Sequence, residues 1–160
     1  MSFINGKGRL QTVVTPTSLQ LTKNIAETRE VNRQRQLMVT QQVYIFFNSR
    51  DELQRIDVSK IVYFEADGNY TDIVMVNKLR ASVCMNLGEM EQAIADQIGD
   101  DAKIFVRIGK RFIINMRYVY SINTLKQQLV LSDYDHFAFQ VSISKDALRK
   151  MKELMLMTKV

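Results

Sequence analysis

The segment that most constrains the fold is Ile61–Met85, whose sequence is IVYFEADGNYTDIVMVNKLRASVCM. Three runs rich in β-branched and aromatic residues are separated there by two short polar groups, Asp67-Gly68-Asn69 and Asn77-Lys78. Gly and Asn tolerate positive φ, and such groups between strand-like runs are typical of hairpin turns. The segment therefore predicts three antiparallel strands joined by tight turns, and we expect the first turn to face a partner.

The chain on either side of this segment continues the pattern from Val43 onward. Asn86 and Glu89 have the spacing of a capping box, which predicts a helix that ends at Gly99, and a second helix is expected from Asp146 to Met157. The run 53–58 is expected to be extended or to form a single helical turn. Further strands are expected at 43–47, 104–108, 111–116, 118–122, 125–131 and 137–143. Strands and helices do not alternate, so the pattern favours a mainly β, β-rich α+β fold over a parallel doubly wound sheet.

Residues 1–42 differ in composition from the rest. They contain the only proline, Pro16, and are rich in Thr, Gln and Asn. We expect the part up to Ser18 to be flexible, because it has few apolar residues to bury. From Ser18 to Met38, Leu21 and Ile25 fall at helical spacing, which is compatible with a helix. The sequence therefore predicts an N-terminal extension, 1–42, flexible or partly helical, before a globular domain, 43–160. Docking, dimer formation, simple tethering and a basic tail along DNA all remain open as its role, with a solvated linker as the simplest.

Single residues exclude several kinds of site. Cys84 is the only cysteine and His136 the only histidine, so an internal disulfide and a multi-histidine metal site are excluded. The chain has no apolar run of about 18 residues and no secretory signal pattern at its start, so we expect a cytoplasmic protein that does not insert in a membrane. Glu65, Asp67 and Asp72 lie near one hairpin, but a solvated turn explains them more simply than catalysis. We expect no enzyme activity, no metal, no cofactor and no small-molecule substrate.

Charge is distributed unevenly along the chain. The net charge of +5 divides into +4 for 1–42, −6 for 43–102 and +7 for 103–160. A basic face attracts phosphate backbones, so this distribution is compatible with nucleic-acid binding. A solvated surface of mixed charge explains it about equally well.

Three strings in the chain carry a resemblance to a known family. They are DVSKIVYFEADGNYTDI, FVRIGKRFIINMRYVYSI and VSISKDALRKMKEL, in that order, with a helix and a hairpin in the intervals. In these strings the chain resembles the LytTR-type DNA-binding domain of bacterial transcription regulators, from about Val43 to Leu156. The resemblance implies an elongated stack of small antiparallel sheets. It also implies that loop residues enter the DNA grooves, in place of one recognition helix.

The resemblance also implies which side chains contact DNA. They are Asn69, Tyr70 and Thr71 after the first signature, Arg107, Lys110 and Arg111 in the second string, and Ser144 and Lys145 at the last strand. Lysine and arginine at such positions bind phosphates and release counterions. Four of these residues also have a simpler interpretation: Asn69 as a turn residue, Tyr70 as a packed ring, Arg107 as an ion-pair partner and Ser144 as a helix cap.

The second and third strings depart from the family pattern. The family usually has His and Ser where this chain has Gly109 and Arg111, and Arg where this chain has Lys145. Lysine lacks the planar fork that binds guanine through two hydrogen bonds, which predicts looser specificity at that position.

These observations predict a sequence-specific DNA-binding transcription regulator that reads double-stranded promoter DNA through loops, with a homodimer on the DNA as one expectation. Residues 1–42 are too few for the receiver domain that family members commonly carry, so a free-standing domain is expected. The alternative is a protein-interaction module that docks on another regulator and modulates it.

Overall fold

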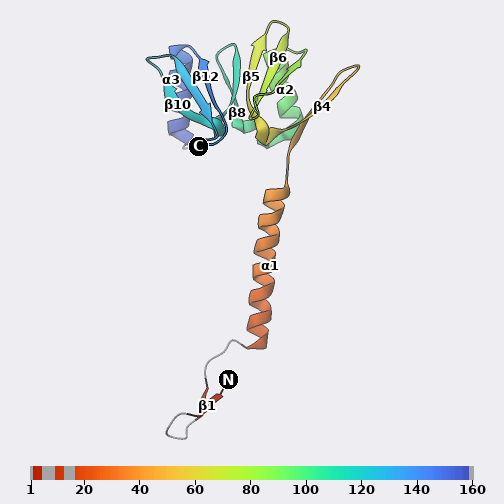
Figure 1. Ribbon diagram of the computed structural model, residues 1–160, viewed down its shortest axis with the longest axis vertical. Coiled ribbons are helices and arrows are strands. Elements are labelled where there is room, and N and C mark those ends of the chain that lie inside the picture. The colour runs from red at the N-terminus through yellow and green to blue at the C-terminus, as the bar shows by residue number, and fades with distance from the viewer. Residues whose placement is uncertain (1, 5–9, 13–16, 159–160) are drawn as a thin grey trace. The chain divides into compact units, whose positions relative to one another are not determined.

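The chain forms two units in a computed structural model, Met1–Gln41 and Gln42–Val160, and each is described by itself. Residues 2–4, 10–12 and 17–158 are described (Figure 1). In the first unit, β1 (Ser2–Ile4) pairs antiparallel with β2 (Leu10–Thr12), and α1 spans Ser18–Thr40. The helix begins where the sequence predicted it and ends two residues later than Met38. The short β1–β2 pair was not expected. Apart from Thr17 and Ser18, the other residues for which flexibility was predicted lie outside the described ones.

Within Ser18–Arg35, helix α1 keeps its large apolar side chains in solvent. Leu19, Leu21, Ile25 and Val31 are 84, 48, 49 and 49% exposed. One ion pair joins Arg33 and Glu30 one turn apart, at 4.0 Å. No helix in the described part of the chain is both long and apolar enough to cross a membrane.

The Gln42–Val160 unit is built from short strands and two helices. Its strands are β3 (Tyr44–Asn48), β4 (Leu53–Asp57), β5 (Ile61–Asp67), β6 (Tyr70–Met75), β7 (Arg80–Val83), β8 (Phe105–Ile108), β9 (Phe112–Asn115), β10 (Val119–Asn123), β11 (Gln128–Ser132) and β12 (Ala138–Ser142). Its helices are α2 (Leu87–Ile98) and α3 (Lys145–Thr158), with single 3-10 segments at Val58–Lys60, Gly99–Ile104 and Met116–Tyr118.

A five-stranded antiparallel sheet, in the order β7-β6-β5-β9-β8, is the centre of this unit. Two smaller antiparallel sheets accompany it, β3-β4 and β10-β11-β12 (Figure 1). The predicted β-rich fold of small antiparallel sheets with a mid-chain and a C-terminal helix is confirmed.

Each face of the central sheet covers its own core. Because strand side chains alternate between faces, Phe64, Ile73 and Ile113 face one core, which they share with α2 and the β3-β4 hairpin. Val74 and Ile114 face the second core, which the β10-β11-β12 sheet and α3 complete. The two cores are formed mainly by residues of the strands and helices, so the turns at the strand ends contribute little to either core.

Helix α2 begins at the predicted capping box. The Asn86 side chain accepts a hydrogen bond from the Glu89 N–H at 2.9 Å, and the Glu89 carboxylate accepts one from the Asn86 N–H at 2.9 Å. Leu87, Met90 and Ile94 form its buried face. The helix predicted from the capping box and the apolar stripe is therefore confirmed.

Candidate nucleic-acid interface

The β5–β6 turn consists of Gly68 and Asn69 and presents Tyr70 beside it. Gly68 has a φ of +59°, which a residue without Cβ adopts at little cost. Among the described residues, the non-glycine positive φ angles belong to Lys78, Gln127 and Tyr134. Asn69 therefore does not occupy the turn for its left-handed tolerance. Both it and Tyr70, 49% exposed, are open to a partner.

The β8–β9 turn carries Gly109, Lys110 and Arg111. Gly109 has a φ of +66°, and a Cβ built on it would lie 3.9 Å from the Cβ of Ala147 in α3. On the other side, the Ala66 N–H donates to the Arg111 carbonyl at 2.8 Å. The turn therefore lies between the end of β5 and the start of α3. Lys110 and Arg111 are both exposed there.

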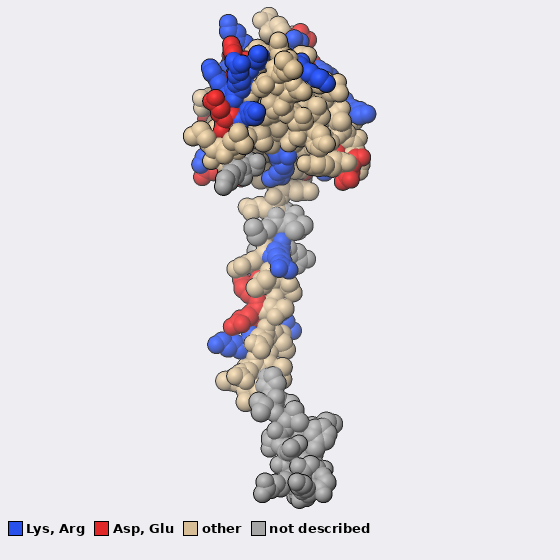
Figure 2. Space-filling view, turned by 90° about the vertical axis from the view of Figure 1, so that its left-hand side faces the viewer, with Lys and Arg blue, Asp and Glu red and all other residues tan. Residues whose placement is uncertain are grey.

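The start of α3 brings the third predicted pair to the same end. The Ser144 hydroxyl accepts the Ala147 N–H at 3.4 Å, so Ser144 acts as the helix cap, as the simpler interpretation had it. Lys145 follows as the first helical residue and is exposed. Figure 1 shows the β5–β6 turn, the β8–β9 turn and the start of α3 at one end of the unit. Lys and Arg side chains lie along that end in Figure 2.

The cationic residues at this end differ in their partners. Arg111 Nη2 lies 3.0 Å from Glu65 Oε1 and its guanidinium is 5.7 Å from the Phe112 ring centroid. Within the described part of the chain, Lys110 and Lys145 have no ion pair. Two exposed lysines without a carboxylate partner can exchange their counterions for phosphates.

Two of the three carboxylates considered for catalysis, Glu65 and Asp72, are paired with arginine. Arg80 Nη1 lies 3.3 Å from Glu65 Oε2 and 3.2 Å from Asp72 Oδ2. Burial acts to lower the pKa of Arg80, but the neighbouring Tyr63, Glu65 and Asp72 raise it above its ordinary value. The pair therefore forms a neutralised cross-strand cluster with Arg80 and Arg111. No group of three acidic, histidine or cysteine side chains placed to hold a metal occurs among the residues described.

Two predicted contact residues have other partners. Thr71 is fully buried, and its hydroxyl donates to the Met85 carbonyl at 2.9 Å. A side chain without exposed surface cannot contact DNA in this conformation, so Thr71 is left out of the interface. Arg107 pairs with Glu91 of α2 at 3.1 Å, the ion pair that its simpler interpretation described. It points to the α2 face, opposite to its buried neighbour Ile108.

One turn at this end was missed. The β10–β11 turn, residues 124–127, carries the exposed Leu125 and Lys126. The Ile143 N–H, next to Ser144, donates to the Gln127 carbonyl at 3.1 Å. The sequence predicted a strand over 125–131, but β11 begins only at Gln128, so Leu125 lies in the turn. The neighbours of the turn depend on how β11 pairs with β12, which the sequence does not show.

A family model for the LytTr DNA-binding domain matches residues 51–156. The chain belongs to the LytTR family. The solved LytTr DNA-binding domain from Bacillus cereus has the same fold, with a TM-score of 0.50 and 19% identity over 71% of this chain and 96% of that one.

Two curated proteins also match. They are the heme-containing CO-sensing transcriptional regulators RcoM 2 and RcoM 1 of Paraburkholderia xenovorans (strain LB400), each 27% identical over 100 residues. The match covers 62% of this chain but 35% of each relative, so the chain spans about a third of their length.

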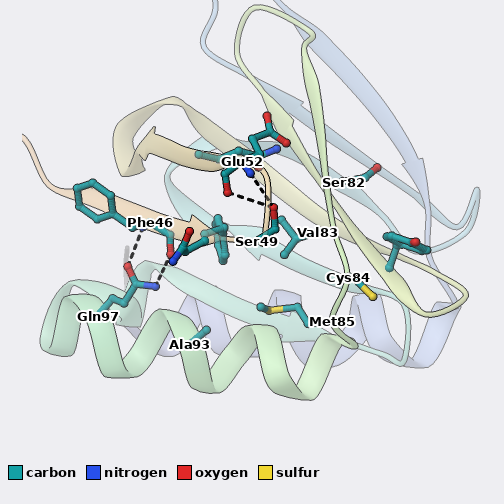
Figure 3. A pocket seen from close by; sticks show the side chains of 13 residues that line it. Phe46, Ser49, Glu52, Ser82, Val83, Cys84, Met85, Ala93 and Gln97 are labelled. Carbon is teal, nitrogen blue, oxygen red and sulfur yellow. Dashed lines mark hydrogen bonds between the residues drawn. The ribbon is translucent and has the colours of Figure 1, made fainter.

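A pocket of about 350 Å³ adjoins the interface of this LytTR chain on the α2 side (Figure 3). The Gln97 amide spans one wall, accepting from the Phe46 N–H at 2.7 Å and donating to the Phe46 carbonyl at 2.8 Å. Tyr70 is the one predicted contact residue in its lining, which also includes Glu52 and the free Cys84. The mixed lining carries a single carboxylate and offers no paired acid and base.

Proposed function

We propose that this chain is a sequence-specific DNA-binding transcription regulator and that its loop end reads promoter DNA. The contacts are Asn69, Tyr70, Lys110, Arg111 and Lys145, with Ser144 orienting the last loop. Arg107 borders this set but is engaged by α2. The observation that carries the proposal is that two lysines, one from the β8–β9 turn and one from the start of α3, are exposed at one end of a LytTR domain and have no ion pair among the described residues. The named function of the RcoM relatives, transcriptional regulation, agrees with it.

The same proposal includes the organisation of the chain. Residues 43–160 are the DNA-binding part and residues 1–42 an extension to it. Two copies on the DNA and a cytoplasmic location also belong to the proposal. The length of DNA protected by the bound protein tests the number of copies, because two adjacent domains cover about twice the length that one covers.

A salt titration tests the interface. Each lysine that binds a phosphate contributes about −0.9 to the slope of log K against log salt. Promoter fragments recovered by genome-wide mapping of bound DNA supply the probe. Replacing both Lys110 and Arg111 by alanine should weaken binding across sequences and reduce the slope by about 2.

The matched control removes two charges from the other end. Lys60 and Lys103 are exposed and precede β5 and β8, so they lie at the strand ends remote from the turns. Their double alanine variant should keep the wild-type slope. Equal loss of slope in the two variants would mean that only net charge matters, and no loss in the first would refute this interface.

Protein docking is the second candidate function, and one observation favours it. Tyr120 and Tyr134 are 58 and 80% exposed and meet edge to face with their centroids 5.5 Å apart. Tyr134 lies in the β11–β12 turn, at the end of its sheet away from Lys145. Exposed tyrosines are typical of protein interfaces. Promoter affinity that hardly changes with salt would favour docking over DNA binding.

A further inference from the structure

The β10–β11 turn exposes an apolar side chain at its tip. Leu125 is 83% exposed. The Asn123 side chain accepts the Lys126 N–H at 2.9 Å, and Gln127 has a φ of +52°. The hydrogen bond closes the turn, yet Leu125 itself belongs to neither core of the unit.

Hydrogen bonds and contacts place this turn in a row with the predicted DNA loops. Gln128 of β11 is opposite Ser142 of β12, and the Gln127 carbonyl accepts the Ile143 N–H, so the turn adjoins Ser144 and Lys145. The start of α3 adjoins the β8–β9 turn through Ala147, and that turn adjoins the end of β5. Four loops therefore follow one another along this end, and the β10–β11 turn is the outermost.

The chemistry of the turn matches one feature of a DNA base edge. Lys126 and Lys145 favour a phosphate backbone, whereas leucine neither donates nor accepts a hydrogen bond. In the major groove, the apolar group that base edges present is the C5 methyl of thymine. Resting on the proposed DNA binding, we propose that the β10–β11 turn is a fourth DNA-reading loop, in which Leu125 contacts a thymine methyl and Lys126 a phosphate.

Leu79 provides the matched comparison for Leu125. It is 60% exposed, follows the β6–β7 turn, and therefore lies at the opposite end of the central sheet. Single exposed leucines are common on protein surfaces and need no function. The two leucines share residue type and are both more than half exposed, but they lie at different ends, so only Leu125 should respond to DNA.

The test combines one substitution in the protein with one in the DNA. The full-length chain is titrated with a promoter fragment recovered by mapping, synthesised once with thymine and once with uracil, which lacks the C5 methyl. Leu125→Ala should weaken binding to the thymine fragment about fourfold, as expected for one buried methyl group. It should leave binding to the uracil fragment unchanged, and Leu125→Met should restore most of the loss. Leu79→Ala should bind both fragments like the wild type.

Several results would overturn the inference. Equal loss on both fragments means that Leu125 contacts sugar or wedges between bases, and no loss on either means that the turn does not reach the DNA. A wild-type chain without salt-dependent binding would instead refute the proposed function itself. Lys126→Ala gives an independent check, because loss of its phosphate should reduce the salt slope by about 1 on both fragments. An unchanged slope would remove Lys126 from the interface.

Discussion

Glu65 restrains the arginine of the candidate interface. Its two carboxylate oxygens bind Arg80 and Arg111, and the side chain is 17% exposed. Arg111 itself is 67% exposed, so its ion pair competes with any phosphate that approaches. The charge of this end therefore depends on Glu65 as well as on the cations.

Replacing Glu65 by Gln should tighten DNA binding about two- to fivefold, because a partly exposed ion pair is worth about 1 kcal/mol or less and Arg111 is released from it. Fluorescence anisotropy at fixed salt measures the change. Asp72→Asn is the control, since Asp72 binds Arg80 but not Arg111. If the two variants tighten binding equally, the cause is the loss of one negative charge in each and not the release of Arg111.

Thr71 supports the fold from inside the predicted contact string. Thr71→Val keeps the shape but removes the donor to Met85, and should cost about 1–2 kcal/mol in the free energy of unfolding. Thr71→Ser should keep most of the stability, and DNA affinity should remain at the wild-type value in both. Urea unfolding measures the stability of the variants, and fluorescence anisotropy measures their DNA affinity. A tenfold loss of affinity in a Thr71→Val protein of normal stability would return Thr71 to the DNA contacts.

At the scale of elements, the β11–β12 turn is ordered by one carboxylate. Asp133 accepts hydrogen bonds from the Asp135, His136 and Phe137 N–H groups at 3.1, 2.7 and 3.1 Å, and from His136 Nδ1 at 2.9 Å. Desolvation acts to raise the pKa of Asp133, but these bonds outweigh it and hold the pKa well below its usual range. The ionised form thus stabilises the turn that carries Tyr134.

The pH dependence of stability follows from the sign of that shift. A lowered folded-state pKa contributes stability above the unfolded value of about 3.9, and the contribution is lost as the pH falls below it. Asp133→Ala should therefore be less stable than wild type by a constant amount above about pH 5. The difference should shrink under more acidic conditions, measured by urea unfolding. Asp135→Ala removes a carboxylate that accepts none of these bonds and should show no such convergence.

The sequence predicted the individual strands and helices better than it predicted which of them lie side by side. Alternation in β5 and β6 and the Gly68-Asn69 turn depend on adjacent residues, so the hairpin was found with its ends nearly right. The pairing of β5 with β9 joins Tyr63 to Ile114, far apart in the chain, and no local pattern announces it. The order of the strands in the central sheet could therefore not be predicted from local sequence patterns.

The same distinction explains the candidate site. The family resemblance implied Lys110 and Lys145 as contacts, and the structure leaves both exposed. Arg107 alternates with the apolar Ile108, so a strict period of two would have directed it away from the second core. Burial of Thr71 and the place of Leu125 depend on pairing with β7 and β12, which the motifs do not contain.

At the scale of the whole molecule, stability and charge are distributed differently between the two units. Every residue of the two buried cores comes from the Gln42–Val160 unit. Residues 1–42, in contrast, hold six Lys or Arg against two Asp or Glu. The extension therefore adds positive charge without adding to either core.

A chain that starts at residue 43 should consequently fold alone. Since 1 kcal/mol shifts the Tm of a domain of this size by about 3–5 °C, we expect its Tm to stay within about 2 °C of the full-length transition. Differential scanning calorimetry measures this, with the full-length chain under the same buffer as control. A drop of about 10 °C would mean that the extension stabilises the domain. The dependence of DNA affinity on salt distinguishes the remaining roles. If the slope of log K against log salt is unchanged, residues 1–42 are a tether or a docking segment. If the slope falls by about 1 per missing phosphate contact, they are part of the DNA interface.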